Sequence, residues 1–206
     1  MKIKVCGMRD PQNIASVAEL KPDYMGFIFY ERTPRYAGNM PPEAVHALPD
    51  DICRVGVFVN ATYSEICSIA DKYRLDMVQL HGDEPAEFCA SIRKLRPVIK
   101  SVAIESAGDV GFYAGLYADV VDYLLFDTRT PLFGGSGQRF DWEVLETYTG
   151  DTPFFLSGGV GPEDARCLND LRLPAMHAVD VNSRFETAPA LKNIELLKEF
   201  IKTVKI

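Results

Sequence analysis

Several features that would point directly to a function are missing from this 206-residue sequence. It has no basic run, and 22 Lys plus Arg stand against 29 Asp plus Glu, for a formal net charge of -7. A chain this acidic is a poor candidate for binding nucleic acid or an anionic membrane through its overall field. Any anionic ligand must therefore be held by a local arrangement of groups.

Cysteine pairs, long apolar segments and a secretion signal are also lacking. The five cysteines are an odd number, and none stands in a CxxC or Cys/His spacing, which argues against a disulfide framework and a structural zinc site. No apolar run approaches the ~18 residues of a membrane span. Residues 1–10, MKIKVCGMRD, lack the apolar stretch and cleavage site of a signal peptide. We therefore expect a cytoplasmic protein without nucleic-acid or membrane partners.

The sequence does contain apolar runs that alternate with amphipathic stretches. Hydrophobic residues make up 47% and charged residues 25%, as in an ordinary globular protein. Most runs are too continuous for half-exposed strands, so we expect strands that are covered on both faces. The runs are Ile3–Cys6, Tyr24–Phe29, Ile52–Val59, Met77–Leu80, Val98–Ile104, Val121–Phe126, Phe154–Leu156 and Ala178–Val181.

Signals for helix starts lie between these runs. Asp10 followed by Pro11 has the residue types of an N-cap and a first helical position, and the segments at 42–43, 84–85 and 161–163 are similar. Residues 62–73 and 193–201 place apolar side chains at helical spacing. The pattern therefore predicts alternating strands and helices.

Eight strand candidates in 206 residues give roughly 26 residues per unit, near the ~30 of a βαβ element. An open doubly wound sheet and a closed (β/α)8 barrel are both compatible with this spacing of strands. An open sheet would be favoured by a glycine fingerprint after the first strand, and the segment CGMRD at 6–10 is not one. We predict an α/β fold, a single-domain (β/α)8 TIM barrel over residues 1–206.

A (β/α)8 barrel carries its active site at the C-terminal ends of its strands. Glycine clusters follow the sixth and seventh predicted strands, and a small polar segment follows the eighth. Neighbouring clusters predict a phosphate site, because glycines let backbone N–H groups approach an anion, although each glycine alone is better explained by a turn. The predicted phosphate-binding residues are Gly135, Ser136, Gly137, Gly158, Gly159, Ser183 and Arg184.

Titratable side chains also stand at predicted strand ends. A thiol at Cys6 and a carboxyl at Asp127 can serve as a base and an acid if their surroundings separate their pKa values. Taken singly, Cys6 also fits a small buried hydrophobe, and Asp127 fits a loop cap. Arg35 is either a carboxylate clamp or a solvated loop arginine, and His81 has either a structural or a site role.

Taken in order, these segments resemble the phosphoribosylanthranilate isomerases of tryptophan biosynthesis. Lys4–Met8 is similar to the family's opening K-[IV]-C-G motif, and Thr33–Tyr36 to its S-x-R-Y loop. The resemblance runs from Lys4 to about Pro189. The other matching segments are Gly26–Phe29, Val55–Asn60, Val78–Gly82, Gly134–Gly137 with Phe140–Trp142, Leu156–Val160 and Val179–Val181.

The resemblance implies an Amadori rearrangement of N-(5′-phosphoribosyl)anthranilate to 1-(2-carboxyphenylamino)-1-deoxyribulose 5-phosphate, without metal or cofactor. Asp127 would be the general acid that opens the sugar ring, and Cys6 the general base that takes the C2′ proton. Arg35 would orient the anthranilate carboxylate and Asp180 would lie near the ribose hydroxyls, with His81 as a further substrate-binding candidate. The ligand would be a phosphorylated small molecule, and a homodimer is the candidate assembly.

One segment departs from the family pattern. The family usually has V-D-V-S-S-G-V-E at the eighth strand, whereas this chain has Asn182 and Arg184 in place of two small residues. Arg184 could add charge to the phosphate site or point away from it. The alternatives are a histidine-pathway isomerase, which resembles a duplicated half-barrel with Asp at both catalytic positions, a lyase or epimerase barrel, and a non-catalytic sugar-phosphate-binding barrel.

Overall fold

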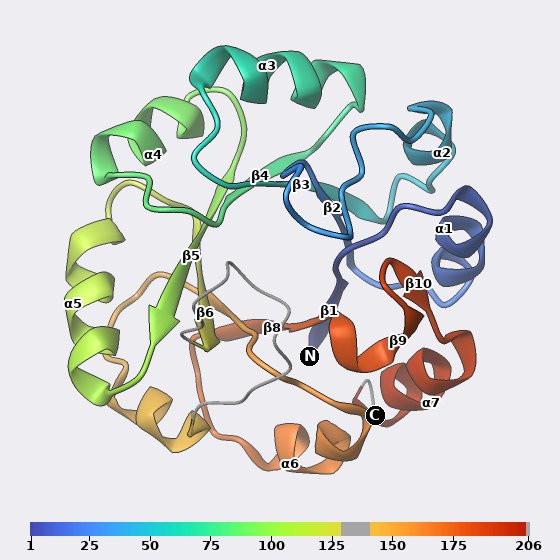
Figure 1. Ribbon diagram of the computed structural model, residues 1–206. Helices are drawn as coiled ribbons and strands as arrows, with labels where there is room; N and C mark the ends of the chain where they lie inside the picture. Colours follow the sequence, from blue (N-terminus) through green and yellow to red (C-terminus); the bar gives the residue numbers. More distant parts are fainter. Residues whose placement is uncertain (129–140, 205–206) are drawn as a thin grey trace.

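A computed structural model describes residues 1–128 and 141–204. Eight parallel strands follow one another in chain order and close into a barrel, because β1 pairs with both β2 and β8 (Figure 1). The predicted TIM-barrel fold is confirmed. The strands are β1 (Lys2–Val5), β2 (Tyr24–Ile28), β3 (Cys53–Phe58), β4 (Met77–Leu80), β5 (Val98–Ile104), β6 (Tyr123–Thr128), β7 (Phe154–Leu156) and β8 (Met176–Val181).

Helices form a ring around this barrel (Figure 1). A two-stranded antiparallel hairpin, β9 (Glu186–Ala188) with β10 (Leu191–Lys192), follows β8. The helices are α1 (Pro11–Ala18), α2 (Glu43–His46), α3 (Tyr63–Lys72), α4 (Ala86–Arg93), α5 (Ala107–Tyr117), α6 (Ala165–Asp170) and α7 (Ile194–Val204), with 3₁₀ helices η1 (Trp142–Thr147), η2 (Pro162–Asp164) and η3 (Ser183–Phe185).

Local capping explains where the helices begin. The Asp10 carboxylate accepts a hydrogen bond from the Asn13 N–H at 2.8 Å, and Pro11 is the first residue of α1. At α3, the Thr62 hydroxyl accepts from the Glu65 N–H while the Glu65 carboxylate accepts from the Thr62 N–H at 2.7 Å. Each cap satisfies N–H groups that have no partner within the helix.

The barrel interior has an apolar floor beneath a more polar layer. Side chains alternate along a strand, so residues two positions apart both point inward. The floor is a buried cluster of Tyr24, Val55, Met77, Ile99, Leu125, Phe155 and Ala178. Two positions further on come Gly26, Val57, Gln79, Ser101, Asp127, Ser157 and Asp180. Polar groups therefore collect toward the C-terminal ends of the strands.

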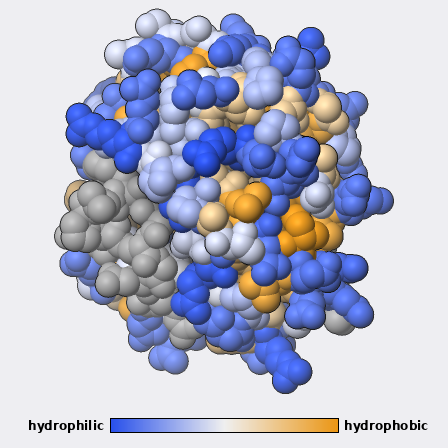
Figure 2. Space-filling model, turned by 45° about the vertical axis from the view of Figure 1, so that its right-hand side comes forward, coloured by the Kyte–Doolittle hydropathy of each residue, from blue (hydrophilic) through white to orange (hydrophobic). Residues whose placement is uncertain are grey.

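The main apolar core lies between the barrel and the helices. Helix α7 contributes Leu197, Phe200, Ile201 and Val204, all buried. The face seen in Figure 2 is mostly hydrophilic, with hydrophobic residues confined to small areas. Within residues 1–128 and 141–204, no helix is both long and apolar enough to span a membrane.

Four parts of the fold had no signal of their own in the sequence: α5, η1, η3 and the β9–β10 hairpin. Helix α5 contains three glycines, at 108, 111 and 115, and this composition obscures its helical pattern. Between β6 and β7 the described chain forms the short helix η1, and the β9–β10 hairpin has too few residues to give a periodic signal.

Candidate active site

Two groups of polar residues lie at the C-terminal end of the barrel. One lies at the seam between β1 and β8, where Lys4 is the register partner of Asp180. The other lies at the ends of β4 and β6 and contains His81 and Asp127. In the closed strand order only β7 and β8 separate β6 from β1, so both groups belong to one barrel mouth.

The first group surrounds Cys6 with charge. Lys4 is completely buried, and its Nζ donates to Asp180 Oδ1 at 2.9 Å. Gly26 on β2 makes room for this arrangement, because a Cβ there would lie 2.7 Å from Cys6 Sγ and 3.2 Å from Lys4 Nζ. The thiol and the ammonium thus share one small space, and Cys6 is not simply a hydrophobe in an apolar core.

Burial and charge act in opposite directions on these groups. Burial raises the pKa of the Cys6 thiol, and the cations of Lys4 and Lys192 offset that rise only in part. Burial alone would lower the pKa of Lys4, but Asp180 and Cys6 outweigh it, so the pKa lies above its ordinary value. Lys4 therefore remains a cation beside the thiol and stabilises its thiolate form.

The second group contains the Asp127 carboxyl, which has few neighbours that stabilise its charged form. Asp127 Oδ1 accepts from the Thr128 N–H at 2.8 Å, and Oδ2 lies 3.5 Å from His81 Nε2. The opposite ring nitrogen of His81, Nδ1, is 2.9 Å from the amide nitrogen of Gln79. If that amide donates to Nδ1, the imidazole carries its proton on Nε2 and presents it to Asp127.

Burial shifts the pKa values of Asp127 and His81 in opposite directions. Burial raises the pKa of Asp127 to about 6, opposed chiefly by the Thr128 N–H. Burial, then the cations of Lys100 and Lys4, lower the pKa of His81 to about 3. The imidazole is therefore neutral near neutral pH and gives Asp127 no ion pair. A carboxyl in these surroundings retains a protonated fraction that can act as an acid.

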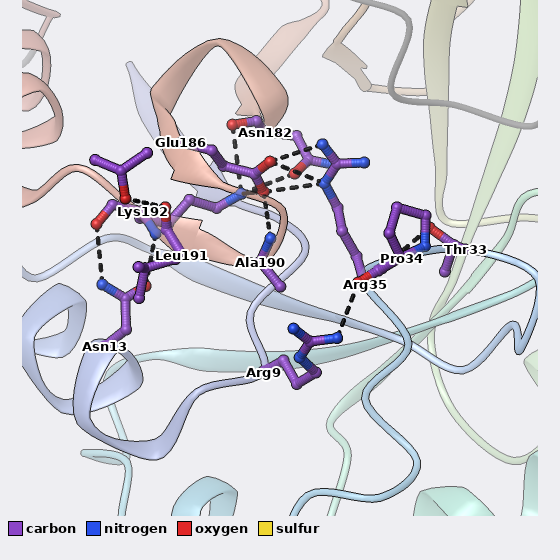
Figure 3. A network of polar contacts seen from close by, with 11 residues as sticks. Arg9, Asn13, Thr33, Pro34, Arg35, Asn182, Glu186, Ala190, Leu191 and Lys192 are labelled. Atoms are coloured by element: carbon purple, nitrogen blue, oxygen red, sulfur yellow. Dashed lines mark hydrogen bonds and ion pairs between the residues drawn. The ribbon is translucent and has the colours of Figure 1, made fainter.

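Arg35 is not a solvated loop arginine. Its guanidinium is bound by the Glu186 carboxylate on β9, with Nη2 donating to Oε2 at 2.6 Å. Glu186 in turn accepts from the Lys192 ammonium at 2.6 Å. Arg35 thus reaches the edge of the mouth next to β1 and β8, as part of a charged network (Figure 3).

The predicted phosphate residues are only partly described. Gly135, Ser136 and Gly137 lie outside the described residues. Gly158 and Gly159 follow β7 with φ of +84° and +72°, a conformation that glycine adopts without strain. A Cβ on Gly158 would lie 3.3 Å from Asp127 Oδ1, which brings this loop against the carboxyl. Ser183 begins η3 directly after β8, the neighbour of β7.

Comparison with known proteins decides between the family alternatives. A model of the family "N-(5'phosphoribosyl)anthranilate (PRA) isomerase" matches residues 3–203. A Parabacteroides distasonis protein named N-(5'-phosphoribosyl)anthranilate isomerase is 45% identical, over 99% of this chain and 93% of that protein. This chain belongs to the phosphoribosylanthranilate isomerase family.

Solved structures agree with this membership. The phosphoribosyl anthranilate isomerase of Thermotoga maritima has a TM-score of 0.85 and 35% identity, over 100% of this chain and 98% of that one. Another isomerase structure, in complex with reduced 1-(o-carboxyphenylamino)-1-deoxyribulose 5-phosphate, has a TM-score of 0.81 and 32% identity over the same shares of the two chains.

The eighth loop is where this member departs from the family pattern. Asn182 follows β8, and its side-chain oxygen accepts from the Lys192 ammonium at 2.8 Å. Arg184 is half exposed and pairs with Glu163 in the segment after β7. In this structure the Arg184 charge is therefore engaged at the surface rather than free.

Four functional neighbours were not singled out from the sequence. Lys4 had a readable signal, since it is a charged residue inside an apolar strand run and must face either solvent or a buried partner. Gln79 has the same kind of position on β4. Glu186 coincides with the closing Glu of the family's eighth-strand pattern, and Lys192 had no signal. Both lie beyond the last predicted strand, and only the folded structure shows Glu186 bound to Arg35 and to Lys192.

Proposed function

We propose that Asp127 and Cys6 are the general acid and general base of the family's reaction, the isomerisation of N-(5′-phosphoribosyl)anthranilate in tryptophan biosynthesis. The protein is an isomerase of this family. One observation supports the assignment: the barrel mouth holds a buried thiol beside a cation and a carboxyl whose pKa is raised by burial. Two titratable groups in contrasting surroundings are the arrangement that acid–base catalysis needs.

In the first step Asp127 protonates the furanose ring oxygen. The bond from this oxygen to C1′ breaks while the lone pair of the anthranilate nitrogen forms the C1′=N bond of an iminium. A carboxyl with a pKa of about 6 is protonated in about a tenth of molecules at pH 7, which suffices for a proton donor. The His81 imidazole is neutral and its Nε2 lies 3.5 Å from Asp127 Oδ2, so it does not stabilise the ionised form of the acid as a cation would.

In the second step the Cys6 thiolate removes the proton from C2′. The electron pair of that C–H bond forms the C1′=C2′ bond while the iminium π pair moves to nitrogen, which gives an enolamine. Protonation at C1′ and loss of the C2′ hydroxyl proton then give the ketone at C2′. The iminium is the electron sink for this step. Lys4 holds positive charge next to the sulfur and favours the thiolate that abstraction requires.

The remaining residues bind the substrate. Arg35 takes the anthranilate carboxylate, and Asp180, already held by Lys4, lies near the ribose hydroxyls. The loops after β6, β7 and β8 take the phosphate, with Gly135, Ser136, Gly137, Gly158, Gly159 and Ser183 as donors. The surface pair with Glu163 makes Arg184 a peripheral member of that set.

The wider assignments belong to the same proposal. Residues 1–206 form one catalytic domain, and the protein acts in the cytoplasm as a homodimer. A Thermotoga maritima relative described as dimeric supports the assembly.

Turnover of freshly prepared phosphoribosylanthranilate tests the function directly. At an enzyme concentration far below that of substrate, anthranilate fluorescence should change until the substrate is consumed. A binding protein would change the signal only in proportion to its own concentration. No turnover above spontaneous substrate decay, from a protein with a cooperative unfolding transition, would contradict the proposal.

A further inference from the structure

Arg35 is held along one edge of its guanidinium. Nε donates to Glu186 Oε1 at 3.0 Å and Oε2 at 3.1 Å, and Nη2 donates to Oε2 at 2.6 Å (Figure 3). The two side chains are only 12% and 5% exposed. A fork bound to a carboxylate through two nitrogens has a defined plane, so Glu186 determines where the rest of the guanidinium points.

Glu186 is itself fixed from the other side. The Lys192 ammonium is completely buried and donates to Glu186 Oε1 at 2.6 Å, to Asn182 Oδ1 at 2.8 Å and to the Asn182 carbonyl at 3.3 Å. These three contacts use all three donors of the ammonium. The Lys192 ammonium, on the side of Glu186 away from Arg35, therefore has no N–H left for another acceptor.

The backbone beneath Lys192 is anchored to the barrel periphery. Asn13 on α1 donates to the Lys192 carbonyl at 2.9 Å and accepts from the Lys192 N–H at 2.8 Å. On the other side, a Cβ on Gly7 would lie 2.9 Å from Arg35 Cδ and 2.6 Å from Asn182 Oδ1. Gly7 follows Cys6 directly, so the network lies against the loop that carries the base.

The charges of the network leave it positive. Burial opposes ionisation of Glu186, yet the hydrogen bonds from Arg35 and the Lys192 cation lower its pKa, so it is a carboxylate. Two cations and one anion leave one positive charge in excess. Without Lys192, the Arg35–Glu186 pair would be neutral and would attract an incoming carboxylate less strongly.

The bonds to Glu186 also leave one edge of Arg35 unused. Among the described residues, no acceptor engages Nη1, and Nη2 has a second N–H. These two nitrogens form the end of the guanidinium, the edge that binds a second carboxylate in bidentate geometry.

We propose that Glu186 and Lys192 are positioning residues that preset Arg35 for the carboxylate of the substrate's aromatic amine and so give the enzyme its preference for a carboxylated amine. The inference rests on the proposed role of Arg35 in binding that carboxylate. Preorganisation lowers the ordering cost of a long side chain on binding, and a misaligned fork recovers charge attraction but not the two parallel bonds.

The test measures selectivity rather than activity alone. Calorimetry gives the affinity for reduced 1-(o-carboxyphenylamino)-1-deoxyribulose 5-phosphate, for the same compound without its carboxyl group, and for inorganic phosphate. The ratio of the first two affinities reports on the carboxylate site. Glu186→Gln should lower this ratio about tenfold and leave phosphate affinity unchanged, because the phosphate loops do not include Glu186.

Two further variants separate positioning from charge and from stability. Glu186→Gln/Lys192→Gln removes one negative and one positive charge, so it keeps the net charge of the network and leaves no buried ammonium without its carboxylate. It therefore decides the question even where the single variant fails to fold. It should show the same fall in ratio. Glu84→Gln is the matched control, since Glu84 is equally buried and pairs with Lys100 at 2.9 Å. It should lose stability but keep the wild-type ratio.

The outcomes distinguish this inference from the proposed function. If Arg35→Ala keeps the wild-type ratio, Arg35 does not bind the carboxylate and the underlying role fails. If Arg35→Ala lowers the ratio while the folded double variant stays within twofold of wild type, Arg35 binds the carboxylate without help from Glu186, and the positioning role is overturned. A fall in ratio for both supports it.

Discussion

Cys6 is buried and Asp127 is partly buried in the same barrel mouth, but the fold gives them different neighbours. Cys6 lies beside Lys4, which is itself bound to Asp180, so the thiol is surrounded by charged groups. Asp127 lies beside a neutral imidazole and the N–H of Thr128. Burial raises the pKa of both groups. The Lys4 cation is the largest influence that opposes this rise at Cys6, whereas at Asp127 the Thr128 N–H opposes it first and Lys4 contributes least.

In the proposed function, this difference lets one barrel mouth serve two opposite proton transfers. The acid needs surroundings that favour its neutral form, and a desolvated site with few donors provides them. The base needs surroundings that favour its charged form, and a fixed ammonium provides them. Variants that alter one side without the other test the division.

The largest effect is expected at the base. Cys6→Ser should lower kcat by several orders of magnitude, because a serine hydroxyl does not ionise near neutral pH and the C2′ proton has no acceptor. Affinity for a product analogue should stay close to wild type. Steady-state kinetics with calorimetry gives both values, and retention of more than a tenth of wild-type kcat would show that Cys6 is not the base.

At the acid side, Asp127→Asn should lower kcat by about 10² to 10⁴, the usual contribution of general acid catalysis. The amide still donates a hydrogen bond to the ring oxygen but cannot transfer a proton. The same fluorescence assay measures the loss. A decrease of less than tenfold would assign the acid to another residue, with Asp180 as the next candidate.

The raised pKa of Asp127 also predicts a change in stability with pH. Between its ordinary value of 3.8 and about 6, the folded protein keeps a proton that the unfolded chain releases. This contribution is complete below pH 3.8 and is lost as the pH rises through 6. The Asp127→Asn side chain does not ionise, so the variant does not lose this contribution. The difference in free energy of unfolding, variant minus wild type, should therefore increase by up to about 3 kcal/mol from pH 4 to pH 7.5. Urea denaturation at both pH values measures this, and parallel pH curves would refute it.

The smallest effect concerns the cation beside the thiol. Lys4→Met should slow iodoacetamide alkylation of Cys6 about tenfold at pH 8, because the thiolate loses its nearest positive charge. Peptide-resolved mass spectrometry separates Cys6 from the other four cysteines. The control is Lys100→Met, which removes a second buried strand lysine and its ion pair with Glu84. Equal rates for the two variants would mean that Lys4 does not activate the thiol.

Much of this arrangement could be predicted from the sequence, and the exceptions share a physical cause. The strands at 77–80, 98–104 and 154–156 agree with prediction to the residue because apolar runs covered on both faces give a strong signal. Cys6, Asp127 and Asp180 could be placed at the mouth because they stand at strand ends. Residue roles, in contrast, depend on partners distant in sequence.

The Arg35 network illustrates that limit. Arg35 and Glu186 are 151 positions apart, and no periodicity or spacing connects a loop after the second strand to a hairpin after the eighth. The family resemblance therefore made Arg35 a candidate carboxylate clamp, but nothing in the sequence pointed to the Glu186 carboxylate that already holds it. The same holds for Lys4, whose partner Asp180 becomes visible only when the barrel closes.

The ion pair between Lys4 and Asp180 also has a consequence for the order of assembly. It joins residues 176 positions apart, across the seam where the first strand meets the last. During synthesis the amino-terminal strand, with its lysine and thiol, leaves the ribosome long before its carboxylate partner exists. Contacts of such long sequence separation form late in folding, since loop closure must precede them. The Cys6 side of the mouth is therefore completed only when β8 docks against β1. A nascent chain that has emerged only as far as β7 lacks this part of the candidate site.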